Sequence, residues 1–419
     1  MSGQMEVTRA SYRADLARPL EDGFQGVLQG IATRRHLPSY REPERLAENV
    51  AALSRVYNAR SEGSPADGGF LGARLCFSFP RDVPKGAAAV AELVLAGALR
   101  LDQGDLRVLD LGAGLGATSR GVARALAAAG ASGTLAVDLV DADEDALAIA
   151  EEIVRARPKE GKVALAARAV VRDAAAFERR GKPYDLILVG QTLSELDRGL
   201  DPAARVAAHA SLLGRLAREA LTKTGSLVVI EPALRDRSRH LHQVRDVLAA
   251  AGHTIFAPCL HERACPALVR ENDWCHEDLA VALPSWLVPT ARAAGLRFEG
   301  LSFAYLVLRS DGTRLGTMLP ASGLVRAVSG PLVSKGKHEV LLCPAEQGRT
   351  GLIRGMRLDR HIAASNEAWG YIERGDLLRL SPPLPVAGTG STTARIEPGT
   401  KVSVVDVPRV TVAPSEPPT

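Results

Sequence analysis

The chain has few of the residues that would place it in several common protein classes. Only five of its 419 residues are cysteine and 4% are aromatic, and no apolar run approaches the roughly 18 residues of a membrane span. The first 23 residues lack the apolar stretch of a signal peptide, and their acidic side chains argue against a transit peptide. Abundant Ala and Arg favour a GC-rich bacterial genome. We therefore expect a bacterial cytoplasmic protein without a membrane partner, whose thiols stay reduced.

The formal charge of +4 is only mildly basic. It permits an anionic partner such as a nucleic acid but does not require one, so any such claim needs a local basic patch. With 46% hydrophobic and 24% charged residues, the composition is that of a globular protein. Its length is enough for two or three domains.

The order of the predicted elements divides the chain into five segments. Residues 105–256 alternate short apolar runs with helical patterns, which predicts right-handed βαβ units and a parallel sheet, an α/β fold. Residues 61–86, rich in Gly, Pro and Ser, are expected to form a loop. The five segments are a helical N-terminal region (1–100), a Rossmann-like domain (101–256), a cysteine segment (257–295), a small β-rich C-terminal module (296–385) and a loose Pro-rich tail (386–419).

A glycine loop follows the first predicted strand, in VLDLGAGLGATS. A helix follows the loop, and Asp141 ends the next strand, where a carboxylate can accept hydrogen bonds from ribose hydroxyls. This arrangement resembles class I methyltransferases that use S-adenosylmethionine. The resemblance implies cofactor-binding roles for Asp110, Gly112, Gly114, Gly116, Asp141 and Asp173. Two alternatives stay open: the tight turn simply needs glycine, and Asp173 caps a helix.

The predicted strand that would carry methyl-transfer residues ends in GQTLSEL. It lacks the Asn/Asp-Pro-Pro-Tyr motif of many amino-group methyltransferases, and no cysteine stands where an RNA cytosine-C5 methyltransferase needs its nucleophile. Glu195 and Glu231 are candidate bases, but each could equally be structural. Cofactor binding is therefore better supported than catalysis, and the catalytic residues stay unknown.

Three of the five cysteines, Cys259, Cys265 and Cys275, lie within seventeen residues, in a segment too polar for a core strand. Cys343 follows at the end of a β-like run. Four thiolates can complete a tetrahedral zinc site or hold a four-iron, four-sulfur cluster, and the spacing does not decide between them. The alternative, small buried hydrophobes, best fits the fifth cysteine, Cys76. Two histidines are alternative ligands, namely His261 and His276.

The motifs A-P-C-x-H-x-x-x-C-P and D-W-C-H and the late L-L-C, together with the methyltransferase-like loop, resemble the Rsm22 family. These are mitochondrial small-ribosomal-subunit assembly proteins and their bacterial relatives, and the resemblance spans about residues 40–380. It implies a four-iron, four-sulfur cluster on Cys259, Cys265, Cys275 and Cys343, and an S-adenosylmethionine pocket around Asp110, Gly112, Gly114 and Asp141.

The same resemblance implies binding to the small ribosomal subunit through its rRNA. We expect a protein that is monomeric off the ribosome. Two alternatives are an active rRNA methyltransferase with a structural zinc and a non-catalytic rRNA-binding scaffold. Two arginine clusters could contact phosphates or form solvated helix faces. They are Arg235, Arg237, Arg239 and Arg245, and Arg349, Arg354, Arg357 and Arg360.

Overall fold

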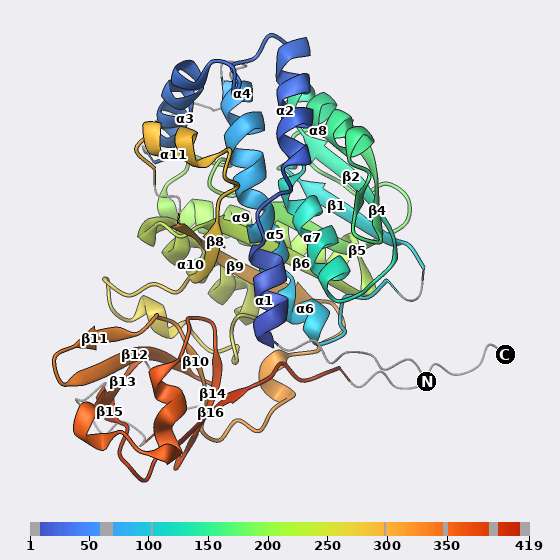
Figure 1. Cartoon of the computed structure of the whole chain (residues 1–419). Coiled ribbons are helices and arrows are strands. Elements are labelled where there is room, and N and C mark those ends of the chain that lie inside the picture. The colour runs from blue at the N-terminus through green and yellow to red at the C-terminus, as the bar shows by residue number, and fades with distance from the viewer. Residues whose placement is uncertain are drawn as a thin grey trace, which may run out of the picture.

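A computed structural model describes residues 9–58, 70–101, 104–296, 299–346, 351–384 and 393–410. Two β-sheets organise the described chain (Figure 1). The first, with helices on both faces, forms the upper part of the view. The second, coloured orange to red, lies below it.

The N-terminal region is helical, as the apolar spacing predicts. Its elements are α1 (Arg9–Ala17), α2 (Gly23–Arg34), α3 (Pro43–Asn58), α4 (Leu71–Ala73), the π-helical turn η2 (Arg74–Ser78), α5 (Phe79–Ala89) and α6 (Ala91–Leu95). The expected loop over residues 61–86 is wrong in its second half, because residues 70–86 are helical. Pro80 stands in the first turn of α5, where its missing N–H costs nothing, although Pro84 lies inside the helix. Residues 59–69 lie outside the described chain.

The first sheet has nine strands. They are β1 (Leu106–Leu111), β2 (Gly133–Asp141), β3 (Lys159–Glu160), β4 (Val163–Val171), β5 (Tyr184–Gly190), β6 (Leu221–Pro232), β7 (Thr254–Ala257), β8 (Glu277–Ala282) and β9 (Glu299–Arg309). Their order is β3-β4-β2-β1-β5-β6-β9-β7, with β8 paired to β9. Neighbours from β4 to β6 are parallel, and β9 runs antiparallel between β6 and β7. This is the Rossmann-like fold of class I methyltransferases.

Two helical layers cover this sheet. Its helices are α7 (Ala117–Ala128), α8 (Glu144–Ala156), α9 (Pro202–Glu219) and α10 (Arg235–Ala250), whereas α11 (Val288–Ala293) packs on α3. Alternate residues of each strand face opposite layers. Val108 of β1 packs with α5, α7 and α8, whereas Leu109 packs with α9 and α10. No helix in the described part of the chain has the length and apolar content needed to span a membrane.

The second sheet holds seven strands. They are β10 (Leu324–Ala327), β11 (Leu332–Ser334), β12 (Lys337–Pro344), β13 (Ile353–Leu358), β14 (Leu377–Ser381), β15 (Thr393–Arg395) and β16 (Lys401–Val405). Short 3-10 helices accompany the two sheets: η3 (Pro266–Leu268), η4 (Leu315–Thr317), η5 (Asp359–His361) and η6 (Ala364–Gly370). The second sheet builds its own core around Trp369, which is fully buried.

The segment boundaries at both ends of the second sheet differ from those expected. Strand β9, assigned by its sequence position to the C-terminal module, lies in the first sheet, where it pairs with β6, β7 and β8. Within the expected tail, β15 and β16 pair with β13 and β14. Ile396 and Val402 bury their side chains in the second core, so residues 393–405 belong to the module despite their Pro-rich surroundings. Residues 411–419 lie outside the described chain.

Candidate functional site

The loop after β1 turns at three glycines. Gly112, Gly114 and Gly116 have φ angles of 71°, 49° and 77°, the left-handed region that glycine adopts without strain. A Cβ atom on Gly112 would lie only 2.2 Å from Oγ1 of Thr192, in the segment after β5. The turn therefore requires glycine both for its backbone angles and for this close approach.

Two aspartates lie next to the glycine loop, one in β1 and one at the end of β2. Asp110 is buried and accepts a hydrogen bond from Oγ of Ser119 at 2.5 Å. Burial raises the pKa of Asp110 to about 6, against the lowering effect of the bonds from Ser119. Asp141, at the end of β2, accepts hydrogen bonds from the backbone N–H of Gly114 at 2.8 Å and of Asp143 at 3.0 Å. Asp141 thus ties the loop to the neighbouring strand.

A large cavity of about 1930 Å³ opens at the carboxyl edge of the first sheet, where ligands of open α/β sheets bind. Four of the six expected cofactor residues line it, namely Gly112, Gly114, Asp141 and Asp173. Asp110 and Gly116 do not. The first is buried beneath the loop, and the second precedes the first turn of α7. Asp173 accepts a hydrogen bond from the backbone N–H of Ala175 at 2.9 Å in a turn, so it does not cap a helix.

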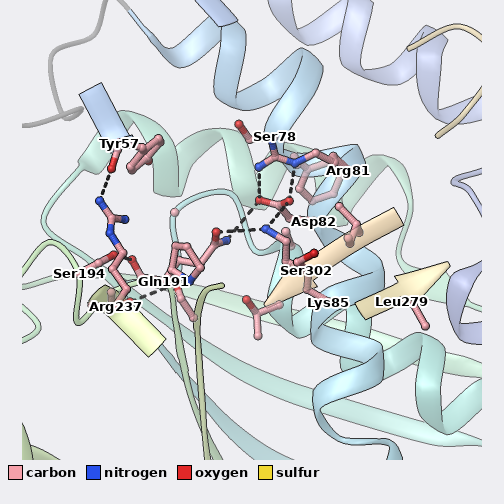
Figure 2. Close-up of a pocket in the computed structure, with 18 of the residues that line it drawn as sticks. Tyr57, Ser78, Arg81, Asp82, Lys85, Gln191, Ser194, Arg237, Leu279 and Ser302 are labelled. Atoms are coloured by element: carbon pink, nitrogen blue, oxygen red, sulfur yellow. Dashed lines mark hydrogen bonds and ion pairs between the residues drawn. The ribbon is translucent and has the colours of Figure 1, made fainter. Parts of the chain in front are cut away.

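Four polar side chains on the wall of this cavity were not identified from the sequence. Arg81, Asp82 and Lys85 come from α5, and Gln191 follows β5 (Figure 2). The three α5 residues fall in the stretch expected to be a loop. The sequence therefore did not predict that they lie together on one helix. A Lys and an Asp three residues apart in a helix would have been the available signal.

The two glutamates considered as bases occupy different environments. Glu195 lines the cavity with an exposed side chain. Glu231 is buried, lies outside the cavity lining and accepts a hydrogen bond from the N–H of Leu193 at 3.0 Å. Burial raises the pKa of Glu231 to about 7. Of the two, only Glu195 is placed to touch a ligand in this cavity.

A second, smaller cavity of about 50 Å³ lies where the two sheets meet. The four clustered cysteines all line it, although they come from distant elements. Cys259 follows β7, Cys265 precedes η3, Cys275 precedes β8, and Cys343 lies on β12 of the second sheet. The structure therefore brings together the four cysteines that the sequence grouped. Cys76 is fully buried elsewhere, within η2 in the core of the N-terminal helices.

The thiols of this cavity influence one another. Burial raises the pKa of Cys265, and the neighbouring Cys259 and Cys275 raise it further. The pKa of Cys343 is raised by burial and then by Cys259 and Cys265. Neutral thiols are therefore favoured unless a cation joins them, because a bound metal ion deprotonates its thiol ligands.

The cavity also holds buried side-chain nitrogen atoms that have no hydrogen-bond partner among the described residues. Arg245, Arg326 and His261 line it, and Nε of each arginine and Nδ1 of the histidine have no partner in the described part of the chain. Buried polar groups are almost always satisfied, so such atoms call for an explanation. A bound group rich in acceptor atoms would provide one.

The described thiols and imidazoles do not form a preassembled site for a single ion. No group of three or more His, Cys, Asp or Glu side chains among the described residues has that geometry. His261 places Nε2 at 3.5 Å from Sγ of Cys343, and His276 stacks on Trp274 at a centroid distance of 5.8 Å. Both histidines line the cavity beside the thiols.

Comparison with known protein families supports the grouping of glycine loop and cysteines. The family model described as "Mitochondrial small ribosomal subunit Rsm22" matches residues 102–371, well over half of the chain. The chain belongs to the Rsm22 family. The matched range contains the glycine loop, all four clustered cysteines and most of the second sheet. No curated protein matches the chain.

Several solved structures share part of the fold. A methyltransferase from Agrobacterium tumefaciens, described as SAM-dependent, is 20% identical, with 55% of this chain and 62% of that one covered and a TM-score of 0.33. The plantazolicin methyltransferase BpumL, solved with SAH, is 12% identical, with 64% and 98% covered and a TM-score of 0.32. The CcbJ methyltransferase of Streptomyces caelestis is 23% identical, with 36% and 49% covered and a TM-score of 0.24.

In this Rsm22 family member, two arginines of the first cluster donate hydrogen bonds to backbone carbonyls of the cysteine segment. Arg239 donates hydrogen bonds to the carbonyls of Ala267, Arg270 and Asp273. Arg245, 2% exposed, donates to carbonyls on both sides of Glu262. The expectation of a phosphate-binding face is wrong for these two arginines.

The second arginine cluster is divided in the same way. Arg357 is buried and donates to the backbone carbonyl of Asn366 at 2.7 Å. Arg354 and Arg360 are exposed, and Arg349 lies outside the described residues. Among the described members of this cluster, Arg354 and Arg360 alone face solvent.

Proposed function

We propose that this chain is an S-adenosylmethionine-binding factor of the small ribosomal subunit whose two sheets are joined by a four-iron, four-sulfur cluster. One observation carries the proposal: four cysteines, from segments up to 84 positions apart in the sequence, line a single cavity between the sheets. The description of the Rsm22 family supports the association with the small subunit. That association would run through rRNA, and the protein would be monomeric off the ribosome.

The large cavity fits the nucleotide cofactor at the glycine loop. Glycine at 112 lets the loop turn tightly against Thr192 at the edge of the cavity, because a Cβ there would strike the Thr192 side chain. Gly112 and Gly114 would face the amino-acid part of S-adenosylmethionine. Asp141 would accept hydrogen bonds from the ribose hydroxyls, and Asp173 would lie at the adenine end. When bound, the cofactor supplies an activated methyl group.

The small cavity fits an iron–sulfur cluster by its donor set. Thiolates are the ligands of such clusters, with four cysteines for each four-iron centre. The unpaired Nε–H donors of Arg245 and Arg326 would find acceptors in cluster sulfides and thiolates. A zinc ion fits less well, because it needs its four sulfur ligands about 2.3 Å away, and no described group of side chains converges on one ion.

The cluster would stabilise the contact between the two sheets. Three of its ligands precede β9, the last strand of the first sheet in chain order, and Cys343 belongs to the second sheet. Binding free energy of a metal centre that only the folded chain can hold is folding free energy. We expect loss of the cluster to release the second sheet from the first. Any ribosome-binding surface of the chain that spans both sheets would then be lost.

Sedimentation with purified small ribosomal subunits tests the association. The anaerobically purified wild-type chain should sediment with the subunit, and Cys265→Ser should sediment with it much less. Cys76→Ala is the matched control, since Cys76 is buried away from the cavity, and it should behave as wild type. Failure of the metal-loaded wild-type chain to sediment with the subunit would contradict the proposal.

A further inference from the structure

A charged network occupies the wall of the large cavity beside the glycine loop (Figure 2). Asp82 lies at its centre. Oδ1 of Asp82 accepts from Nε of Arg81 at 2.7 Å and pairs with Nζ of Lys85 at 3.0 Å. Oδ2 accepts from Nη2 of Arg81 at 3.0 Å and from Nε2 of Gln191 at 3.2 Å. Lys85 also donates to Oε1 of Gln191 at 3.3 Å.

The packing of α5 on α7 fixes this network in place. A Cβ atom on Gly86 would lie 2.6 Å from the carbonyl oxygen of Thr118, and one on Gly121 would lie 2.3 Å from that of Val83. Only glycines allow the two helices to approach so closely. The backbone that carries Asp82 and Lys85 is therefore held against the helix that begins at the glycine loop.

The backbone of Gln191 is held in an unfavourable conformation. Its φ is +60°, a region that few residues other than glycine adopt. Such backbone strain persists where the surrounding structure enforces it, often at binding sites. Here it aims the amide at Asp82 and Lys85. Because β5 pairs with β1, Gln191 lies beside the glycine loop, with Val189 opposite Leu111.

The hydrogen-bonding capacity of the network shows what it lacks. A carboxylate accepts about four hydrogen bonds, and Asp82 already has four. Among the described residues, Lys85 keeps one of its three N–H donors, Gln191 keeps one amide N–H, and the Nη1 donors of Arg81 have no hydrogen-bond partner. The net charge is +1, from two cations and one carboxylate. The network therefore offers donors and positive charge to the cavity, so its complement is an anionic oxygen acceptor.

We propose that Lys85, Gln191 and Arg81 form a carboxylate-binding subsite, with Asp82 holding the three donors in position. The carboxylate belongs either to the amino-acid part of the cofactor or to a separate substrate, and both sources offer the same chemistry. The side chain of Lys85 is only 9% exposed, and such shielding strengthens a charge-assisted hydrogen bond. This inference rests on the proposed cofactor binding only for the first source.

Calorimetry with two nucleosides tests the subsite. S-adenosylhomocysteine carries the amino-acid carboxylate, whereas 5′-methylthioadenosine lacks the whole amino-acid part. Lys85→Met should weaken binding of S-adenosylhomocysteine by about tenfold to a hundredfold, with methylthioadenosine unaffected. Lys162→Met is the matched control, because Lys162 is exposed and does not line the cavity. If Lys85→Met fails to fold, Gln191→Glu replaces it as the test variant. It places a second carboxylate in the network and should also weaken the binding of S-adenosylhomocysteine.

The two sources are separated by a third probe. If the carboxylate belongs to a separate substrate, both nucleosides should bind Lys85→Met normally. In that case saturation-transfer NMR in the presence of S-adenosylhomocysteine should detect acetate binding to the wild-type chain. The same measurement should detect no acetate binding to the Lys85→Met variant. The subsite would be overturned if Lys85→Met weakened the binding of both nucleosides equally. It would also be overturned if the variant bound all three probes as the wild-type chain does. If the wild-type chain binds neither nucleoside, the proposed cofactor binding fails, and acetate alone decides the subsite.

Discussion

Sγ of Cys343 lies 3.5 Å from Nε2 of His261, across the junction of the two sheets. Cys343 belongs to β12 of the second sheet, and His261 to the loop after β7 of the first. Nearby, Arg263 donates to the backbone carbonyl of Pro344 at 2.6 Å. The cysteine loop therefore contacts the second sheet through side chains and backbone together. A cluster bound at this junction would hold both sheets at once.

Cys343→Ser should lower both the metal content and the stability of the chain. The substitution removes the one ligand that the second sheet contributes. Because metal binding of this kind adds to folding free energy, the melting temperature should fall by about 10 °C or more. Cys76→Ala serves as the control for loss of a cysteine. A melting temperature and iron content equal to those of the wild type would count against a shared centre.

Gly112→Ala should abolish most cofactor affinity. The new Cβ would strike Oγ1 of Thr192 at 2.2 Å, so the loop or the segment after β5 must move. We expect S-adenosylhomocysteine to bind at least about tenfold more weakly by calorimetry, or ~1.4 kcal/mol. Gly130→Ala is the control: its φ is +80°, but its Cβ would meet nothing within 4 Å. Comparable losses of affinity in both variants would show that backbone strain alone is responsible.

Arg245→Met should release the cysteine segment without altering nucleic-acid binding directly. The guanidinium of Arg245 donates to the carbonyls of His261 and Arg263 and pairs with Asp246 at 2.6 Å. Its removal leaves buried carbonyls unsatisfied, at a cost of about 3 kcal/mol. Iron release to a chelator should accelerate.

The control for this prediction is Arg235→Met on the same helix. Arg235 is exposed and donates to the side chain of Asn272 at 2.9 Å. Its replacement should leave iron release unchanged. If Arg245→Met reduced the salt dependence of RNA binding while retaining its iron at the wild-type rate, Arg245 would be a phosphate contact after all.

Glu231 should make stability depend on pH in a defined window. Burial raises its pKa from 4.5 to about 7, so the folded state holds this proton more tightly than the unfolded state. The free energy of unfolding should fall as the pH rises from 4.5 to 7, by up to about 3 kcal/mol. Glu231→Gln keeps an oxygen for the N–H of Leu193 and should remove this part of the dependence.

Denaturant unfolding of both forms at pH 5 and pH 8 measures the effect. Other groups that titrate in the window, Asp110 among them, are present in both forms and cancel in the difference. The variant should gain stability relative to the wild type at pH 8 and little at pH 5. A difference that is the same at both pH values would show that Glu231 is not protonated preferentially in the folded state.

The sequence was enough to predict the central fold and the grouping of the cysteines. Strands such as β1 and β5 are short apolar runs between helical patterns, so periodicity identified them. Cys343 was grouped with the other three by motif order, and the cavity confirms that they lie together. The four cysteines are separated in sequence but share one junction, which local patterns alone do not show.

The errors have physical causes. Strand β9 lies in the first sheet and not in the module that its sequence position predicts, because a strand's partners depend on tertiary packing, which its own sequence does not encode. Residues 70–86 form helices although they are rich in Gly and Pro, because Gly86 allows close packing of α5 on α7. Arg245 was counted as a surface arginine because charge patterns do not reveal which guanidinium groups satisfy buried carbonyls.

The most direct test of the account is the iron, acid-labile sulfide and zinc content of the anaerobically purified chain. We predict about four iron and four sulfide per chain, with both lost in Cys343→Ser and retained in Cys76→Ala. One zinc without sulfide, or a full cluster in Cys343→Ser, would contradict the claim that an iron–sulfur centre joins the two sheets.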